Sequence, residues 1–586
     1  MKNLIITCFS FLLIIHIPVT AQDEGEFLFN STYDYIYNNS PQHIEMIDLD
    51  NDGTVDPVIM LYGRSEVTSP RQIHLFYKES GSWNSIHLFQ DGSSFCGMQY
   101  CSNGPLDGKI LSMANYSGVT HFAVIDLDDW QVTTVSPGEL FNSFVYLNDG
   151  SILAGRNLGI YKSSDQGSTF NHIFDIGDGD SNVDLSSAGV LPIRVSENGQ
   201  HLSIVGAFDD AATTGVPDIV YNYFSNDFGA TWQGNILGRG SGSHSMYGQI
   251  SNRDYAPYFT NFGQFSHLVD NDGKTHVVIN GYGQGVLEGS TDTTSVFPVL
   301  FWNNNNQEWI ATTLAGQEAP GDAAGNLITG GTTVRTYPGN GIGNAYGSVS
   351  FSDDDQFVFT AWQGMEFLGE IGNSNWNMFP GDGGPESGVI YYTDIYYTYS
   401  TDGGSTWSTV NKLEGGEGVM EMYPLLSRKP AIDPVSGHYL VNYLYYEDAV
   451  PGVSVFNGQI SGQNSSSTDG AWKYNSLQLD FGPTNVDGNN SVVENFRLEQ
   501  NYPNPFNPNT VIKYQLPDAG NVTLKVYDVL GSEVATLVNE YKNAGSYEIE
   551  FNTQQATSNK QLSSGVYFYQ MKAGKFVETR KMIYIR

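Results

Sequence analysis

An eight-residue pattern, S-x-D-x-G-x-T-[FW], occurs three times in this chain of 586 residues and constrains its fold more than any other feature. Each copy follows a stretch rich in aromatic and β-branched residues. Asp can accept bonds from the backbone N–H groups that follow it, Gly tolerates a positive φ, and the closing aromatic can enter a core. The pattern therefore predicts a tight turn between antiparallel strands, used repeatedly. The copies begin at Ser163, Ser225 and Ser400.

These three copies resemble the Asp-box of the sialidase-like (BNR-repeat) β-propellers. In that family the box caps the turn between the third and fourth strands of a blade, away from the ligand-binding face. The resemblance implies that the boxes mark the fold and take no part in chemistry. The same strand–turn–aromatic rhythm, in weaker form, ends at Trp83, Trp130, Trp309 and Trp472.

The boxes and the weaker copies supply seven blade-end aromatics, unevenly spaced. We therefore expect an all-β fold, a six- or seven-bladed β-propeller. Seven blades are favoured, and six are the alternative because catalytic sialidases use six. The composition agrees, since 65 glycines, 13% aromatic and only 15% charged residues describe short strands and turns better than long amphipathic helices.

Residues 1–21 have the features of a secretory signal peptide: a basic start, a short apolar run and small residues at the expected cut. No later stretch approaches the length of a membrane span. The formal net charge of −37 gives the chain no general attraction for phosphate backbones, which argues against nucleic-acid binding. The sequence predicts an exported protein without a transmembrane segment.

Export would place Cys96 and Cys101 in an oxidising compartment. Five residues apart, they point to opposite faces of one continuous strand, so a disulfide needs a turn between them. A disulfide and two buried free thiols both remain open.

One acidic loop has the spacing of a calcium site. Carboxylates stand at positions 1, 3, 5 and 9 of the run 48–56, with Gly53 at position 6. Ca²⁺ takes six or more oxygen ligands, and this spacing can wrap the chain around one ion. The flanks have the composition of strands, so the loop resembles the calcium loops of FG-GAP-type propeller repeats more than an EF-hand. We expect a structural Ca²⁺ held by Asp48, Asp50, Asp52, Asp56 and the backbone carbonyl of Thr54.

The C-terminal region has strand periodicity. Apolar residues alternate with polar ones at 512–516, 522–526 and 547–551, and a fourth segment at 565–570 leads into a hairpin. Period-2 alternation with turns at this spacing predicts a small Ig-like β-sandwich. The division of the chain is then a signal peptide (1–21), a propeller (22–481), a linker (482–496) and a C-terminal domain (497–586).

The same region closely resembles the C-terminal sorting domain of the type IX secretion system of Bacteroidetes and their relatives. The resemblance covers about 90 residues. It implies that the outer-membrane translocon reads residues 497–586, and that the cargo becomes secreted or attached to the outer cell surface after crossing the periplasm. The matching motifs are Asn501-Tyr-Pro-Asn-Pro-Phe-Asn-Pro, Val526-Tyr-Asp-Val-Leu-Gly531, Ala544-Gly-Ser-Tyr547 and Leu562-Ser-Ser-Gly-Val-Tyr-Phe-Tyr569.

Catalytic signals are weak. The sialidase pattern needs Arg-Ile-Pro and two further arginines, but Pro192-Ile-Arg194 has the reverse order, and nothing places Arg335 and Arg428 on one face. The sequence therefore favours an exported propeller that binds glycan or protein ligands. A secreted glycoside hydrolase that uses the propeller funnel is the alternative, and its catalytic residues are unknown. Aromatic clusters at 255–265 and 362–379 are candidates for ligand stacking or for packing between blades.

Overall fold

The computed structural model of the chain divides into two compact units, residues 1–483 and 484–586, and each unit is considered by itself. The described residues are 25–31, 42–50, 52–65, 69–79, 81–177, 183–184, 192–210, 219–239, 248–250, 253–257, 265–286, 293–306, 308–312, 319–321, 327–329, 332–334, 344–365, 378–379, 390–391, 393–416, 419–448, 470–483, 497–498, 501, 504, 506, 508–516, 520–529, 531–542, 545–552, 562–573 and 576–585. The expected signal peptide and most of the expected linker lie outside them.

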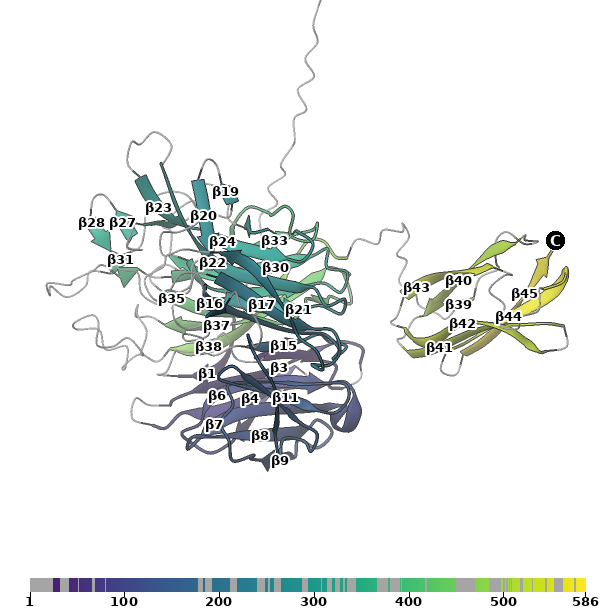
Figure 1. Cartoon of the computed structure of the whole chain (residues 1–586), viewed down its shortest axis with the longest axis horizontal. Coiled ribbons are helices and arrows are strands. Elements are labelled where there is room, and N and C mark those ends of the chain that lie inside the picture. Colours follow the sequence, from purple (N-terminus) through teal and green to yellow (C-terminus); the bar gives the residue numbers. More distant parts are fainter. Residues whose placement is uncertain are drawn as a thin grey trace, which may run out of the picture. The chain divides into compact units, whose positions relative to one another are not determined.

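Consecutive antiparallel sheets make up the first unit, and each uses neighbouring segments of the chain (Figure 1). The first three sheets are β2 (Ile44–Ile47), β3 (Asp56–Gly63), β4 (Gln72–Glu79) and β5 (Ser82–Leu88); then β6 (Ser94–Cys101), β7 (Lys109–Tyr116), β8 (Val119–Asp126) and β9 (Val132–Val135); then β10 (Ser143–Tyr146), β11 (Ile152–Arg156), β12 (Gly159–Ser163) and β13 (Asn171–Asp175). A 3₁₀ helix, η1 (Gly104–Leu106), joins β6 to β7.

Three more sheets continue the series in chain order. They are β15 (Ile193–Val195), β16 (Leu202–Asp210), β17 (Ile219–Ser225) and β18 (Gln233–Arg239), with β14 (Val183–Asp184) also on β16; then β21 (Phe265–Val269), β22 (Thr275–Val286), β24 (Val299–Asn303) and β25 (Ile310–Ala311); then β29 (Asn344–Phe351), β30 (Val358–Met365), β33 (Thr393–Ser400) and β34 (Asn411–Glu414).

The last sheet joins the two ends of this unit. It contains β35 (Met420–Leu426), β36 (Ala431–Ile432), β37 (Tyr439–Asp448) and β38 (Ala471–Gln478), and β1 (Glu26–Asn30) from the start of the chain completes it. Glu26 pairs with Tyr474 in an antiparallel register. The fourth strand of the last sheet is therefore supplied by the N-terminal segment, which ties the first sheet to the last.

Apolar side chains fill the spaces between neighbouring sheets, so the core is a ring of interfaces. One cluster joins the last sheet to the first two, and contains Trp472, Val58 and Met98, each fully buried. Five further clusters each fill the space between two neighbouring sheets: second and third, third and fourth, fourth and fifth, fifth and sixth, and sixth and last. This closed series of antiparallel sheets is the arrangement of a β-propeller.

Additional short strands extend the connections of the fourth to sixth sheets. They are β19 (Gly248–Ile250), β20 (Arg253–Pro257), β23 (Thr293–Phe297) and β26 (Ala319–Gly321), which form one sheet with the end of β22, and the pairs β27 (Leu327–Thr329) with β28 (Thr332–Val334) and β31 (Met378–Phe379) with β32 (Ile390–Tyr391). In Figure 1 the labelled members of this set gather on one side of the first unit.

Strand direction assigns every connection to one of two ends. In an antiparallel meander, the turns from first to second and from third to fourth strand share one end, which we name the turn end. The second-to-third turns and the links to the next sheet share the other, which we name the insertion end because the additional strands lie on those connections. The three repeated turns all lie at the turn end, because each joins a third to a fourth strand.

Six of the seven expected aromatics flank third-to-fourth turns, but Trp472 does not. It lies in β38, the third strand of its sheet, and pairs with Tyr446 of β37. The expectation of a blade-end turn there was wrong, because the N-terminal β1 forms the fourth strand and the chain makes no hairpin at that point.

The second unit has two antiparallel sheets around a shared apolar core. One contains β39 (Arg497–Leu498), β40 (Asn509–Leu516) and β43 (Gly545–Asn552); the other contains β42 (Glu533–Lys542), β41 (Gly520–Tyr527), β44 (Gly565–Ala573) and β45 (Phe576–Tyr584). The strand faces that the alternation predicts to be apolar are buried in this core. Their side chains are at most 2% exposed at Ile512, Tyr514, Leu524 and Val526.

Candidate functional sites at the two ends of the ring

The repeated turns are held by the same hydrogen bonds in all three copies. At the third copy, Asp402 Oδ1 accepts the backbone N–H of Thr406 over 2.8 Å, and its Oδ2 accepts the Thr406 hydroxyl over 2.6 Å. The hydroxyl of Ser400 accepts the N–H of Gly404 over 2.8 Å. These bonds engage both carboxylate oxygens and hold the turn between the third and fourth strands.

The acidic loop brings together the carboxylates that the sequence selected. Oxygens of Asp48, Asp50 and Asp52 lie within 4.8 Å of one another at the surface. The Asp52 N–H donates to Asp48 and Asp50 over 3.1 and 3.2 Å. Burial raises the pKa of Asp56, and the three neighbouring carboxylates raise it further, so the fourth acid lies close to the same cluster. The N–H and hydroxyl of Thr54 both donate to Asp52.

Arg428 crosses the ring at the turn end. It follows β35 of the last sheet, yet its guanidinium donates to the carbonyl oxygens of Val195 in β15 and Val269 in β21. The next residue, Lys429, pairs with Glu197 over 2.9 Å and with Asp353 over 3.4 Å. The last sheet is thereby tied to the fourth, fifth and sixth sheets, and these side chains lie across the turn end of the ring.

The space left beside this crossing is small. A cavity of about 160 Å³ is lined by Glu45, Gln99, Glu197, Arg428 and Lys429 among others. Burial raises the pKa of Glu45 to about 7, although Arg428 opposes the shift. Drug-sized or disaccharide-sized ligands need several hundred Å³, so this cavity suits water or a small ion.

Two of the three arginines considered for a sialidase site do approach each other. Arg194 and Arg428 line one further pocket, and burial together with the charge of Arg428 lowers the pKa of Arg194 to about 10. Both guanidiniums donate to backbone carbonyls, since Arg194 Nε bonds the carbonyl of His267 over 3.2 Å. Arg335 lies outside the described residues. These contacts hold strands together.

A pair of buried carboxyl groups lies at the insertion end. Glu421, near the start of β35, is 3% exposed, and Asp394, near the start of β33, is fully buried. Lys412 pairs with Asp394 over 2.7 Å, and the Tyr396 hydroxyl donates to it over 2.9 Å. Burial and then the charge of Asp394 raise the pKa of Glu421 to about 9, so Glu421 is protonated at neutral pH.

The structure describes only some of the residues in the two aromatic clusters. Trp362 is 1% exposed and packs between sheets, as does much of the aromatic content. Tyr258, Phe259, Phe262, Phe367 and Trp376 lie outside the described residues.

Cys101 is a free, buried thiol on the same strand as Cys96, and burial raises its pKa. Of the two alternatives, the structure therefore shows Cys101 as a free thiol and not in a disulfide.

Two buried groups were missed by sequence reasoning: the Glu421 carboxyl, and the cluster Asp270, His276 and Asp355. Asp355 is 79 residues from His276, and no spacing rule links them. A polar residue in an otherwise apolar strand, as His276 is in Thr275–Ile279, is the one local signal available.

Comparisons with known proteins identify the C-terminal region. Residues 500–586 match the model of the secretion system C-terminal sorting domain, which confirms that prediction. No curated protein matches the chain.

Several solved structures share a distant likeness. The GH74 enzyme of Niastella koreensis is 11% identical, with 95% of this chain and 73% of that chain covered and a TM-score of 0.35. The α-L-arabinanase of Penicillium chrysogenum is 10% identical, with 78% and 98% covered and a TM-score of 0.29. The α-L-arabinofuranosidase Arb93A of Fusarium graminearum is 11% identical, with 77% and 98% covered and a TM-score of 0.30. Likenesses at these scores assign no activity to this chain.

Within the described residues, no helix is long and apolar enough to cross a membrane. The family model that matches residues 500–586 describes a secretion system C-terminal sorting domain. This chain therefore carries a secretion system C-terminal sorting domain, and it is exported through the type IX secretion system to the cell surface or the extracellular space.

Proposed function

We propose that the exported propeller binds a glycan or protein ligand outside the cell and uses its insertion end to do so. The observation that supports this most is the contrast between the two ends. Arg428 and Lys429 cross the turn end and join four sheets, whereas the insertion end carries the additional strands β19, β20, β23, β26, β27, β28, β31 and β32. A rigid ring with elaborated connections on one face is a usual support for recognition.

The finer structural expectations belong to the same proposal. Seven blades are supported by the seven sheets of four or more strands among the described residues of the first unit, and an Ig-like second unit is supported by its two packed sheets. Calcium binding by Asp48, Asp50, Asp52, Thr54 and Asp56 is supported by the grouping of the first three carboxylates. In this proposal the ion stiffens the link between β2 and β3 and takes no part in ligand binding.

A glycan array and a panel of extracellular proteins, probed with the purified full chain, test the binding proposal. We expect specific binding that survives Lys429→Ala, because Lys429 lies at the turn end. A complete lack of ligands in both panels, or binding that Lys429→Ala abolishes while the variant remains folded, would contradict the proposed use of the insertion end.

A glycoside hydrolase is the second candidate, and the Glu421–Asp394 pair favours it. Glycosidases commonly use one protonated and one ionised carboxyl group, and neighbouring acids with different environments provide that combination. Here Glu421 holds a proton and Lys412 pairs with Asp394. Turnover of a chromogenic glycoside by the wild-type chain, lost in Glu421→Gln, would establish this function. No turnover of any glycoside in the panel would leave the carboxyl pair as part of the core.

A further inference from the structure

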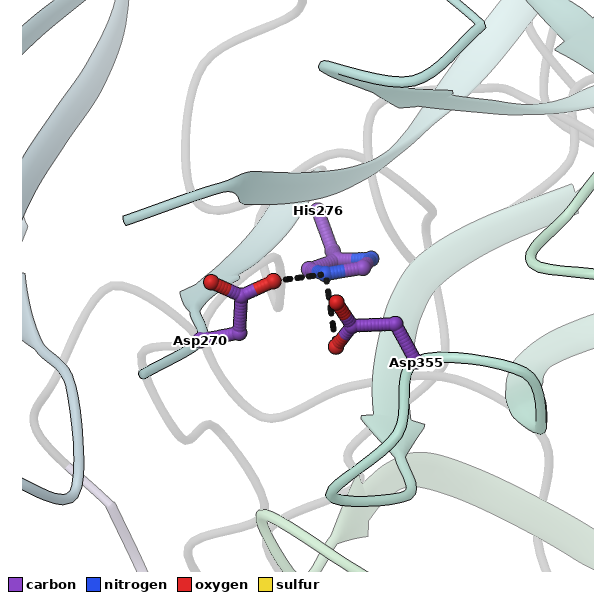
Figure 2. Close-up of side chains that lie close together, drawn as sticks. All are labelled: Asp270, His276 and Asp355. Carbon is purple, nitrogen blue, oxygen red and sulfur yellow. Dashed lines mark hydrogen bonds and ion pairs between the residues drawn. The ribbon is translucent and has the colours of Figure 1, made fainter. Parts of the chain in front are cut away.

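Three buried side chains meet between the fifth and sixth sheets at the turn end, apart from the proposed ligand face. His276 lies in β22, Asp270 in the turn that precedes β22, and Asp355 in the turn between β29 and β30. Their exposed fractions are 0%, 5% and 4%. Figure 2 shows both carboxylates directed at the same edge of the imidazole ring.

The separations between these groups are long for hydrogen bonds. His276 Nε2 lies 3.4 Å from Asp270 Oδ2 and 3.6 Å from Asp355 Oδ1. An N–H···O bond is usually about 2.9 Å long, so neither separation is that of a short single hydrogen bond, and one N–H shared between both oxygens would make only two weak ones. Ligand atoms around a tetrahedral ion with bonds of about 2.0–2.2 Å stand about 3.3–3.6 Å apart, which matches both separations.

Each carboxylate is anchored through one oxygen and turns the other toward His276. Asp270 Oδ1 accepts the backbone N–H groups of Asp272 and Lys274 over 2.9 and 2.8 Å. Asp355 Oδ2 accepts the Lys274 ammonium over 2.9 Å. Outer contacts of this kind orient the ligands of metal sites.

The Oδ1 atom of Asp355 lacks a hydrogen bond within the described part of the chain. It is buried and has no hydrogen-bond partner among the described residues. A buried acceptor oxygen left without a hydrogen bond is unfavourable, and here Lys274 pairs only with the other oxygen of the Asp355 carboxylate. A bound metal ion would satisfy this oxygen, Asp270 Oδ2 and His276 Nε2 together.

The competing explanation is a protonated imidazole held between two carboxylates. Burial lowers the pKa of His276, but the two carboxylates raise it above its ordinary value overall. An imidazolium would place a positive charge 3.6 Å from Asp355 Oδ1, yet both separations would remain longer than a usual N–H···O bond. The Nδ1 atom of His276 has no partner within the described residues under either explanation, so it does not discriminate between them.

We propose that Asp270, His276 and Asp355 bind one divalent transition-metal ion of the zinc type, which joins the fifth and sixth sheets. One imidazole with two carboxylates suits Zn²⁺ better than Ca²⁺, because Ca²⁺ prefers six or more oxygens. The ion is structural, since all three ligands are shielded from solvent. This site is independent of the calcium loop and of the proposed ligand-binding end.

The test uses the full chain, purified without a polyhistidine tag, stripped with a chelator and then exposed to ZnCl₂. After gel filtration we expect about one Zn²⁺ per chain by mass spectrometry for the wild type. Asp355→Asn should retain less than about a tenth of that amount, because it removes one ligand charge. Asp50→Asn, which makes the same change in the exposed acidic loop, should retain zinc like the wild type.

Absence of zinc from the wild type, or equal retention by Asp355→Asn, overturns the proposal. Circular dichroism checks that the variant is folded. If it is not, Co²⁺ loading of the wild type decides: a tetrahedral site gives intense visible absorption that Zn²⁺ displaces, and its absence overturns the proposal. A metal-free wild type in which His276 titrates above its ordinary pKa by NMR would establish the imidazolium instead.

Discussion

The Arg428 guanidinium donates a hydrogen bond to the carbonyl oxygen of Val269 over 3.2 Å, although the two residues belong to sheets that are not neighbours in the ring. A second bond from the same nitrogen reaches Val195. One side chain thus satisfies backbone acceptors of two innermost strands, β15 and β21, from across the channel. The turn end is consequently crossed by a side chain of the fold itself.

Removal of this crossing should destabilise the first unit. We expect Arg428→Ala to lower the free energy of unfolding by about 2–4 kcal/mol, because two carbonyls lose a charged donor and a partly buried space opens. Urea denaturation measures the change. The control is Arg156→Ala, whose exposed pair with Glu139 should contribute less than about 1 kcal/mol. Equal effects of the two variants would contradict the assigned role.

The repeated turn depends on a glycine for close contact between sheets. Gly404 has a φ of +88°, and a Cβ atom there would collide with the Phe301 ring of the preceding sheet. Gly437 has a φ of +72° with open space around it, so it isolates the backbone cost. We expect Gly404→Ala to cost about 1–3 kcal/mol more than Gly437→Ala in thermal or urea unfolding. Equal costs would show that the turn does not pack against Phe301.

The proton on Glu421 should make stability depend on pH. Its folded-state pKa is about 9, above the ordinary 4.5, so the folded protein binds this proton more tightly than the unfolded chain does. The contribution is fully present below about pH 4.5 and is lost as the pH rises through about 9. Glu421→Gln mimics the neutral form, so its unfolding free energy should fall less between pH 5 and 9 than that of the wild type. Parallel curves would rule out the raised pKa.

Calcium binding by the acidic loop is a separate prediction. Isothermal titration of the chelator-treated chain with CaCl₂ should show one site that Asp50→Ala removes, because Asp50 contributes one of the three grouped carboxylates. Asp355→Asn is the control and should leave the Ca²⁺ isotherm unchanged. Identical heats for the wild type and Asp50→Ala would refute the loop as the site.

The sorting domain predicts where truncated protein accumulates. Deletion of residues 497–586 should leave the chain in the periplasm, because the translocon has no signal to read. Fractionation and surface protease digestion locate the protein. Fusion of the same residues to an unrelated periplasmic protein should bring that protein to the surface. Normal surface delivery of the truncated chain would falsify the role of this region.

The sequence pattern was sufficient to predict structure where all the interacting residues lie in one turn or on one face of a strand. Ser400, Asp402, Gly404 and Thr406 lie within seven residues and form their lock without help from elsewhere. The alternation at Ile512 and Tyr514 buries one face of a strand in the same way. The grouping of Asp48, Asp50 and Asp52 was predictable for the same reason, since short loops bring nearby residues together.

Contacts between distant segments could not be read in this way. Trp472 was assigned to a blade-end turn because nothing local indicates that β1, more than 400 residues earlier, forms the last strand of its sheet. Arg428 was considered for substrate binding, and only the ring closure brings Val195 and Val269 to its guanidinium.

The sequence by itself determined the export route, the all-β class, the repeated turns and the acidic loop, because each depends on interactions within a few residues or on a motif read as a linear signal. Only the tertiary structure decided which sheets Arg428 joins across the ring, that the buried Glu421 lies near enough to Asp394 for its pKa to be raised, and that Asp270 and His276 face Asp355. Each of these depends on burial and on contacts between sheets, and the closing of a ring of sheets sets both.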